Sequence, residues 1–285
     1  MKKVTILDLV AAKNDSATLT MTTAYDATMA RIVDDAGIDC ILVGDSLGMV
    51  VAGHENTLEV TVEQVAYHCR AVRRGAPRPF LIADLPFMSY QTSVEEAVRN
   101  AGRLVQEGRA EAVKLEGGVA VAEQVAAIVA AGIPVCGHLG LTPQSVNAFG
   151  GFKVQGRSSA AAKQILDDAQ ALVDAGVFMI VLEGMPRELA AELTAEVTVP
   201  TIGIGAGLGC DGQVLVCTDL LGMNPDFKPR FVRRFIDGYG LLRGAMTEYV
   251  DAVKSRRFPA IEESFSTPTL TKESDSSPEH RVEEG

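Results

Sequence analysis

Short apolar runs recur along this chain, and helical patterns lie between them. Each run is continuous in hydrophobicity, whereas a strand with one solvated face would alternate between apolar and polar residues. Continuous runs of this kind are typical of parallel β-strands that are covered on both faces. The runs lie at Leu19–Thr23, Cys40–Val43, Phe80–Ala83, Ala112–Leu115, Val135–Gly137, Phe178–Leu182, Thr201–Ile204 and Val214–Cys217.

The segments between these runs have the signals of helices that begin at a cap and end at a glycine. Thr61, with Gln64 three residues later, and Ser93 are candidate N-terminal caps of the helices that follow them. The predicted helices are Ala27–Ala36, Val62–Arg74, Val94–Glu107, Val121–Ala131, Ser159–Ala175 and Arg187–Glu196. Repeated strand and helix units of this number predict an α/β protein, a (β/α)8 TIM barrel. A doubly wound sheet is the alternative, but its dinucleotide fingerprint is missing after the first strand, where Ala24-Tyr25-Asp26 stands.

Additional helices are expected at both ends of the barrel. A small amphipathic helix is predicted at the N-terminus, and one or two helices are predicted between Phe227 and Arg257. We therefore interpret residues 1–262 as a single barrel domain with terminal helices. Residues 263–285 are rich in Ser, Thr, Pro and Glu and have few apolar side chains, so we predict a disordered acidic tail.

Composition excludes several classes of function. The net charge of −11 gives no basis for binding nucleic acid through phosphate neutralisation. No apolar run approaches the ~18 residues of a membrane span, and the apolar stretch after Lys3 is too short for a signal peptide. The five cysteines form no C-x-x-C pair and indicate neither a disulfide framework nor a zinc site. The sequence thus predicts a cytoplasmic protein that acts on small molecules.

Charged residues stand at the ends of five successive predicted strands. In barrels of this kind the catalytic residues lie at the C-terminal ends of the strands. Packing alone does not require so many charges to converge on one rim, and we interpret the cluster as an active site. Its members are Asp45, Asp84, Lys114 with Glu116, His138 and Glu183.

Several carboxylates around one pocket require a cation, and oxygen ligands with one histidine favour Mg²⁺. We expect Asp45 and Asp84 to bind the metal directly and Glu116 to bind it directly or through a water. Lys114 lies two residues from Glu116 and therefore points to the same side of its strand. Such a site suits a 2-oxo acid that chelates Mg²⁺, so that the metal stabilises the enolate formed when a base removes the α-proton. Glu183 is the candidate base.

A series of motifs then resembles a known family, ketopantoate hydroxymethyltransferase, over roughly residues 5–262. The matching segments are TAYD at 23–26, LVGDSLGMV at 42–50, ADLPFMSYQ at 83–91, AVKLEGG at 112–118, GHLGLTPQSV at 137–146, GGFKVQGR at 150–157, VLEG at 181–184, IGIGAG at 202–207 and CDGQVLV at 210–216. Phe152 stands where the family commonly has Tyr, and Leu208-Gly209 replaces a polar pair. These departures do not touch the proposed chemistry.

The resemblance implies a Mg²⁺-dependent barrel that transfers a hydroxymethyl group from 5,10-methylenetetrahydrofolate to 3-methyl-2-oxobutanoate. The product is 2-dehydropantoate, in pantothenate biosynthesis. The resemblance also implies a homodecamer of two stacked pentamers. Asp45, Asp84 and Glu116 match its metal positions, and Glu183 matches its proton acceptor. The expected substrate-binding residues are Asp45, Ser46, Asp84, Lys114 and His138, of which His138 is expected to donate a hydrogen bond or to orient a neighbour.

Two other functions are compatible with the same scaffold. One is a Mg²⁺-dependent 2-oxo-acid lyase or mutase of the isocitrate lyase or phosphoenolpyruvate mutase type, which would need no folate. The other is a catalytically silent metabolite-binding barrel, which a missing Glu183 or metal carboxylate would indicate. All of these residues are present.

Overall fold

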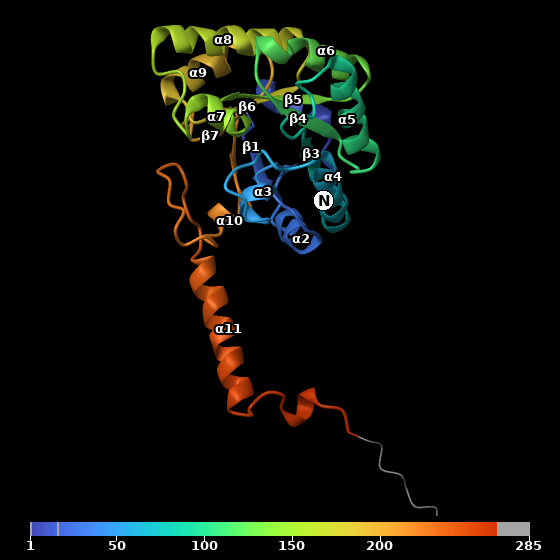
Figure 1. Cartoon of the computed structure of the whole chain (residues 1–285), viewed down its shortest axis with the longest axis vertical. Coiled ribbons are helices and arrows are strands. Elements are labelled where there is room, and N and C mark those ends of the chain that lie inside the picture. Colours follow the sequence, from blue (N-terminus) through green and yellow to red (C-terminus); the bar gives the residue numbers. More distant parts are fainter. Residues whose placement is uncertain (1, 16, 267–285) are drawn as a thin grey trace, which may run out of the picture. The chain divides into compact units, whose positions relative to one another are not determined.

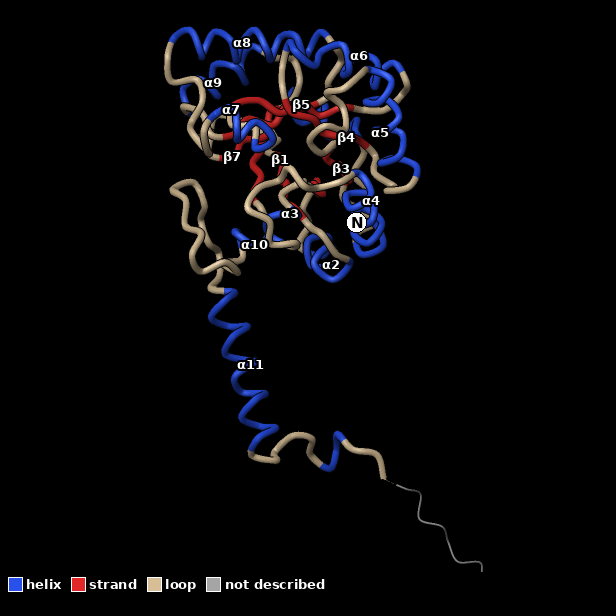
Figure 2. Tube along the Cα trace, viewed as in Figure 1, coloured by secondary structure: helices blue, strands red, loops and turns tan. Residues whose placement is uncertain are grey.

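The protein folds into a closed barrel of eight parallel strands, in the order β1 to β8, which confirms the predicted (β/α)8 fold (Figures 1 and 2). The computed structural model describes residues 2–15 and 17–266 of the 285-residue chain. The strands are β1 Leu19–Thr23, β2 Cys40–Val43, β3 Phe80–Asp84, β4 Ala112–Glu116, β5 Val135–Gly140, β6 Met179–Glu183, β7 Thr201–Ile204 and β8 Gly212–Leu215.

Long helices cover the outer face of this barrel, as Figure 2 shows for α4, α5, α6, α8 and α9. The long helices of the barrel are α2 Ala27–Asp35, α4 Val62–Gly75, α5 Val94–Gln106, α6 Ala122–Ala130, α8 Ser159–Asp174 and α9 Arg187–Glu196. Shorter helices lie in the loops: α3 Leu47–Val50, α7 Val146–Phe149, α10 Cys217–Leu220, and the 3₁₀ turns η1 Val119–Val121 and η2 Pro143–Ser145. The N-terminal helix is α1, Ile6–Asp15.

The predicted helix caps are present. Thr61 and Gln64 form a reciprocal capping box at the start of α4, and the Ser93 hydroxyl accepts a hydrogen bond from the backbone N–H of Glu96 at the start of α5. Gly37 follows the end of α2 with φ of +88°, a left-handed conformation that costs glycine little. Local sequence therefore defines where these helices begin and end.

Alternating strand residues divide the apolar interior into two cores. One set packs beneath the surrounding helices and includes Ile41 and Leu81. The other set fills the inside of the barrel and includes Cys40, Ile82 and Phe178. Helix α1 belongs to this inner core because its buried Leu9 and Ala12 pack against the same cluster. The strand positions that line the inside of the barrel are the ones that reach the active-site rim.

The eighth strand begins earlier than its predicted start at Val214. The strand spans Gly212–Leu215, and Cys217 already begins α10. Gly212 pairs with Leu19, and a Cβ atom built on Gly212 would lie 2.5 Å from the Leu19 carbonyl oxygen. The glycine is therefore required by close contact between strands, although in sequence it is typical of a turn.

The C-terminal part of the chain forms a second compact unit that begins at Gly238. Its helix α11 spans Gly238–Lys254 and is followed by the 3₁₀ turn η3, Ile261–Glu263. The stretch from Phe227 to Asp237, where a helix was also expected, is irregular. Arg234 donates hydrogen bonds to the carbonyl groups of Asn224 and Phe227, which satisfies backbone acceptors without a helix.

Two sequence-based expectations concern the ends of the chain. Residues 267–285, most of the predicted acidic tail, lie outside the described residues, and the boundary at residue 262 remains a prediction. Across the described part of the chain, no helix combines the length and the hydrophobicity needed to cross a membrane.

Candidate active site

The strand register brings the predicted charged residues to one end of the barrel interior. Asp84 on β3 lies opposite Lys114 on β4, and Glu116 on β4 lies opposite His138 on β5. Each of these four residues is at most 5% exposed. Glu183 ends β6 two residues after the inner-core Val181, so it has the same inward orientation.

Asp45, Asp84 and Lys114 form one half of the cluster. The backbone N–H of Asp45 donates to Asp84 Oδ2 at 3.0 Å, and Lys114 Nζ lies 2.6 Å from Asp84 Oδ1. Gly44 makes this approach possible, because a Cβ atom there would lie 3.2 Å from Asp84 Oδ2. The turn after β2 is therefore packed directly onto the Asp84 carboxylate.

Glu116, His138 and Glu183 form the other half. The imidazole of His138 bridges two carboxylates, with Nδ1 lying 3.3 Å from Glu116 Oε1 and Nε2 lying 3.3 Å from Glu183 Oε2. Lys114 Nζ lies 3.2 Å from His138 Nδ1, so the two halves of the cluster are in direct contact. Glu183 is more accessible than the rest, with 19% of its side chain exposed, so it lies nearest to solvent.

Burial and mutual repulsion shift the acid–base behaviour of the first half. Burial raises the pKa of Asp45 well above its usual range, and the nearby carboxylates of Asp84 and Glu116 raise it further. Burial also raises the pKa of Asp84, while the Lys114 ammonium group opposes that rise. Burial alone would lower the pKa of Lys114, but the three surrounding carboxylates raise it above its ordinary value. Lys114 is therefore a permanent cation.

His138 is also a cation near neutral pH. Burial and the Lys114 charge lower the pKa of His138, but its contacts with Glu116 and Glu183 outweigh both and raise it to about 9. Burial would raise the pKa of Glu116, and the hydrogen bond from His138 with the two nearby positive charges instead lowers it. The imidazolium group thus favours the ionised form of Glu116.

Ser46 lies beside this cluster without a hydrogen bond to its charged groups. Its hydroxyl is 2.9 Å from the hydroxyl of Tyr25, a buried residue in the turn after β1. A Cβ atom built on Gly44 would lie 2.8 Å from Ser46 Oγ and 3.2 Å from Asp84 Oδ2, which places the serine hydroxyl near the Asp84 carboxylate.

Sequence reasoning missed Gln144, which contacts two of the carboxylates, and Tyr90, which contacts Gln144 and the backbone of Glu116. Gln144 Nε2 donates to Asp45 Oδ2 at 2.8 Å, and its backbone N–H donates to Glu116 Oε2 at 3.0 Å. The Tyr90 hydroxyl lies 2.8 Å from Gln144 Oε1. Tyr90 lies in the loop that follows β3, and Gln144 lies in the loop that follows β5. A position just after a strand was the sequence signal that could have identified them as site residues.

The donor set fits a hard divalent cation. The cluster offers carboxyl oxygens from Asp45, Asp84 and Glu116, the kind of ligand that Mg²⁺ prefers. No described group of three or more His, Cys, Asp or Glu side chains converges enough to hold a metal ion by itself. In the predicted metal site, Asp45 and Asp84 would hold such a cation, with the remaining ligands supplied by substrate and water.

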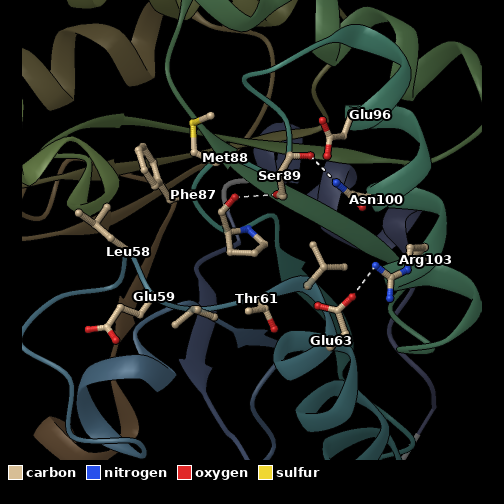
Figure 3. A pocket seen from close by; sticks show the side chains of 13 residues that line it. Leu58, Glu59, Thr61, Glu63, Phe87, Met88, Ser89, Glu96, Asn100 and Arg103 are labelled. Carbon is tan, nitrogen blue, oxygen red and sulfur yellow. Dashed lines mark hydrogen bonds and ion pairs between the residues drawn. The ribbon is translucent and has the colours of Figure 1, made fainter.

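A separate surface hollow of about 390 Å³ lies beside the loop that follows β3 (Figure 3). Figure 3 shows Arg103 turned toward Glu63, to which it donates at 2.8 Å, and Asn100 turned toward the backbone of Ser89. Its lining includes Met88 and no member of the charged cluster. Arg103, the cationic residue in its lining, is already paired with Glu63, so the structure assigns no function to this hollow.

Comparison with known protein families connects this geometry to a chemistry. The model of the family "Ketopantoate hydroxymethyltransferase" matches residues 3–261. The chain belongs to this family. Members of the ketopantoate hydroxymethyltransferase family are transferases, and the similarity extends through the whole barrel and α11.

Two relatives show how close the similarity is. The 3-methyl-2-oxobutanoate hydroxymethyltransferase of Clostridium kluyveri is 56% identical over 265 residues, which cover 93% of this chain and 95% of the relative. The protein of the same name from Enterococcus faecalis is 56% identical over 247 residues, 87% of this chain and 90% of the relative. The alignment thus spans nearly the full length of both proteins.

Solved structures with low sequence identity show the same fold. A phosphonopyruvate hydrolase aligns with a TM-score of 0.61 at 14% identity, covering 94% of this chain and 92% of the hydrolase. A 2,3-dimethylmalate lyase of the PEP mutase/isocitrate lyase superfamily aligns with a TM-score of 0.58 at 14% identity, covering 93% of this chain and 90% of the lyase. These likenesses concern the barrel alone, since fold does not determine reaction.

Proposed function

We propose that this protein transfers a hydroxymethyl group from 5,10-methylenetetrahydrofolate to 3-methyl-2-oxobutanoate, giving 2-dehydropantoate for pantothenate biosynthesis. One observation carries this proposal. The chain belongs to the ketopantoate hydroxymethyltransferase family, and two carboxylates, a buried lysine and a histidine–glutamate pair lie at one end of its barrel. The cluster contains the groups needed to bind a 2-oxo acid and to remove its α-proton.

Asp45 and Asp84 are the proposed metal ligands, and Glu116 binds directly or through a water. Bound Mg²⁺ would supply a Lewis acid for the keto and carboxylate oxygens of the oxo acid. Lys114 provides a fixed positive charge 2.6 Å from Asp84, where it pairs with an anionic oxygen of the substrate. Ser46, whose hydroxyl contacts that of Tyr25, contributes a further hydrogen bond to the substrate.

Glu183 is the proposed proton acceptor. Its carboxylate is the most accessible of the cluster's carboxylates, and His138 Nε2 lies 3.3 Å from its Oε2, which orients the group. Glu183 removes the proton from C3 of the oxo acid, and C3 then forms a bond to the one-carbon unit of the folate. The two bonds from this carbon to the folate nitrogens break, and water supplies the oxygen of the new hydroxymethyl group. One proton from water and the one held by Glu183 go to the two nitrogens, and tetrahydrofolate leaves.

We also propose that the enzyme works as a homodecamer in the cytoplasm. Helix α11 supports the assembly proposal because several of its large apolar side chains are at least 43% exposed, which offers a surface to another copy of the chain. These residues are Tyr239, Leu241, Leu242, Met246, Tyr249, Val250 and Val253. Size-exclusion chromatography with light scattering measures the number of subunits.

The decisive experiment is a turnover assay with 3-methyl-2-oxobutanoate and Mg²⁺, with and without 5,10-methylenetetrahydrofolate. We expect 2-dehydropantoate only when folate donor and metal are both present. A matched control is Glu183→Gln, which keeps the size of the side chain and removes the proposed base. Cleavage of a 2-oxo acid or its hydroxylated relatives without folate would instead indicate a lyase. Tight oxo-acid binding without turnover would indicate a silent binding protein.

A further inference from the structure

We propose that Gln144, held in place by Tyr90, is a positioning residue that fixes Asp45 and Glu116 for cation binding. This inference rests on the proposed function, because it assumes that the carboxylates hold a divalent metal. Gln144 itself does not touch substrate in this proposal. It acts through the two carboxylates that it orients.

The hydrogen bonds around Gln144 determine the orientation of its amide. Its Nε2 faces two acceptors, Asp45 Oδ2 at 2.8 Å and the Leu85 carbonyl oxygen at 3.0 Å. Its Oε1 faces two groups that can donate, the Tyr90 hydroxyl at 2.8 Å and Gln91 Nε2 at 3.3 Å. If the amide were flipped, its oxygen would face the oxygens of Asp45 and Leu85, and its N–H groups would face the N–H groups of Gln91. Both amide protons are therefore committed to Asp45 and Leu85.

Tyr90 connects this amide to the strand that carries Glu116. The Tyr90 hydroxyl accepts a hydrogen bond from the backbone N–H of Glu116 at 3.1 Å. Its single proton then has two nearby acceptors, Gln144 Oε1 at 2.8 Å and the Glu116 carbonyl oxygen at 3.0 Å. The shorter contact favours Gln144. Tyr90 is 1% exposed, so water does not compete for this proton.

Through its side chain and its backbone, Gln144 occupies one oxygen on each of two carboxylates. The amide holds Asp45 Oδ2, and the backbone N–H holds Glu116 Oε2 at 3.0 Å. Asp84 Oδ2 is held in the same manner by the backbone N–H of Asp45. No hydrogen bond among the described residues reaches Asp45 Oδ1. Asp45 thus has one oxygen committed to the protein and one left for a cation.

A neutral donor is suited to this task. A lysine or arginine at position 144 would hold Asp45 as well, but its charge would compete with a metal ion for the same carboxylate. The Gln144 amide is 5% exposed and has partners for both N–H groups and for both lone pairs of its oxygen, so its burial carries no unsatisfied group. It orients Asp45 without neutralising it, as groups behind metal ligands commonly do.

The experiment measures binding of Mn²⁺ alone, in the absence of any substrate, by electron paramagnetic resonance. Gln144→Met keeps the length of the side chain and removes the donor, and we expect Mn²⁺ affinity to fall ~10–100-fold. Tyr90→Phe removes only the hydroxyl, and we expect a smaller loss, roughly 2–10-fold. Gln170→Met is the matched control, because Gln170 is an exposed residue on α8 bonded to Asp174, and its affinity should equal that of the wild type.

Thermal melting in EDTA separates positioning from folding. We expect Tyr90→Phe and Gln144→Met to keep a cooperative transition. When turnover is measured over a range of Mg²⁺ concentrations, the rise in the apparent KM for metal should exceed the change in kcat. If Gln144→Met does not fold, Tyr90→Phe decides the test alone. Wild-type Mn²⁺ affinity in the folded variants overturns the inference. A wild-type protein that binds no divalent ion contradicts the metal site of the proposed function itself.

Discussion

His138 Nε2 and Glu183 Oε2 lie 3.3 Å apart at the end of the barrel, with His138 buried and Glu183 partly exposed. Because the pKa of His138 is raised to about 9, the histidine is an imidazolium group near neutral pH. It can orient Glu183, and it has no free lone pair with which to accept a proton. This relationship supports the proposal that Glu183 is the base, and that proposal is testable.

Glu183→Gln should slow exchange of the C3 hydrogen of 3-methyl-2-oxobutanoate with solvent deuterium. The amide keeps the size of the side chain but cannot accept the proton, and loss of a general base costs ~10²–10⁴-fold in rate. Loss of the C3–H signal by NMR in D₂O with Mg²⁺ measures the rate. The variant should still bind metal and oxo acid. Unchanged exchange would transfer the base role to another residue.

Lys114→Met should weaken binding of the oxo acid and leave binding of the folate donor nearly unchanged. A buried charge-assisted hydrogen bond is worth ~1.5–3 kcal/mol, or roughly 10–150-fold in affinity. Calorimetric titration with each ligand in the presence of Mg²⁺ measures both affinities. Lys163→Met is the control, since Lys163 is exposed and pairs with Asp167 on α8. Equal losses for the two ligands would indicate a structural role for Lys114.

Asp45→Asn should abolish divalent-metal binding and raise the melting temperature of the metal-free protein. The carboxylate of Asp45 is buried among those of Asp84 and Glu116, and its elevated pKa reflects that unfavourable charge. An amide keeps the shape and removes the repulsion, an exchange of function for stability that is common at active sites. Calorimetric melting in EDTA tests the stability, and Mn²⁺ titration tests the binding. A lower melting temperature with intact metal binding would contradict both assignments.

Asp219→Asn should alter stability in a pH-dependent manner. Burial raises the pKa of Asp219 on α10 from 3.8 to about 6, and nearby Arg234 opposes part of that rise. Below the unfolded-state pKa, both the folded and the unfolded state hold the proton on Asp219. Between the two pKa values only the folded state keeps it, so the free energy of unfolding falls as pH rises, and the contribution of the protonated carboxyl group is lost by about pH 6. The variant cannot ionise. Its melting temperature relative to wild type should therefore rise across this window and then level off, and a constant difference would contradict the prediction.

Much of the fold follows from sequence because the local signals agree. Continuous apolar runs, caps such as Thr61 and glycines such as Gly37 identify the strand and helix units, and the closed barrel follows from their number. The start of β8 was missed because Gly212 serves close strand contact, a requirement set by Leu19, which lies far away in sequence.

The candidate site is predictable to the extent that its residues lie on strands. The alternation of strand side chains predicts that Lys114 and Glu116 share a face, and the structure places both in the barrel interior. Gln144 lies in the 3₁₀ turn η2, where no periodicity indicates the direction of a side chain. Its contact with Asp45 joins residues 99 positions apart and depends on the closed barrel.

The charged residues of the cluster come from or directly follow β2 to β6, and the residues that directly follow β1, β7 and β8 are Ala24, Gly205 and Val216. This division has an evolutionary consequence. In the proposed reaction, substitutions along the uncharged arc can change which second substrate approaches the oxo acid, while the proposed activating charges stay in place. On that proposal, such a barrel can exchange its reaction partner and retain its way of making a carbon nucleophile.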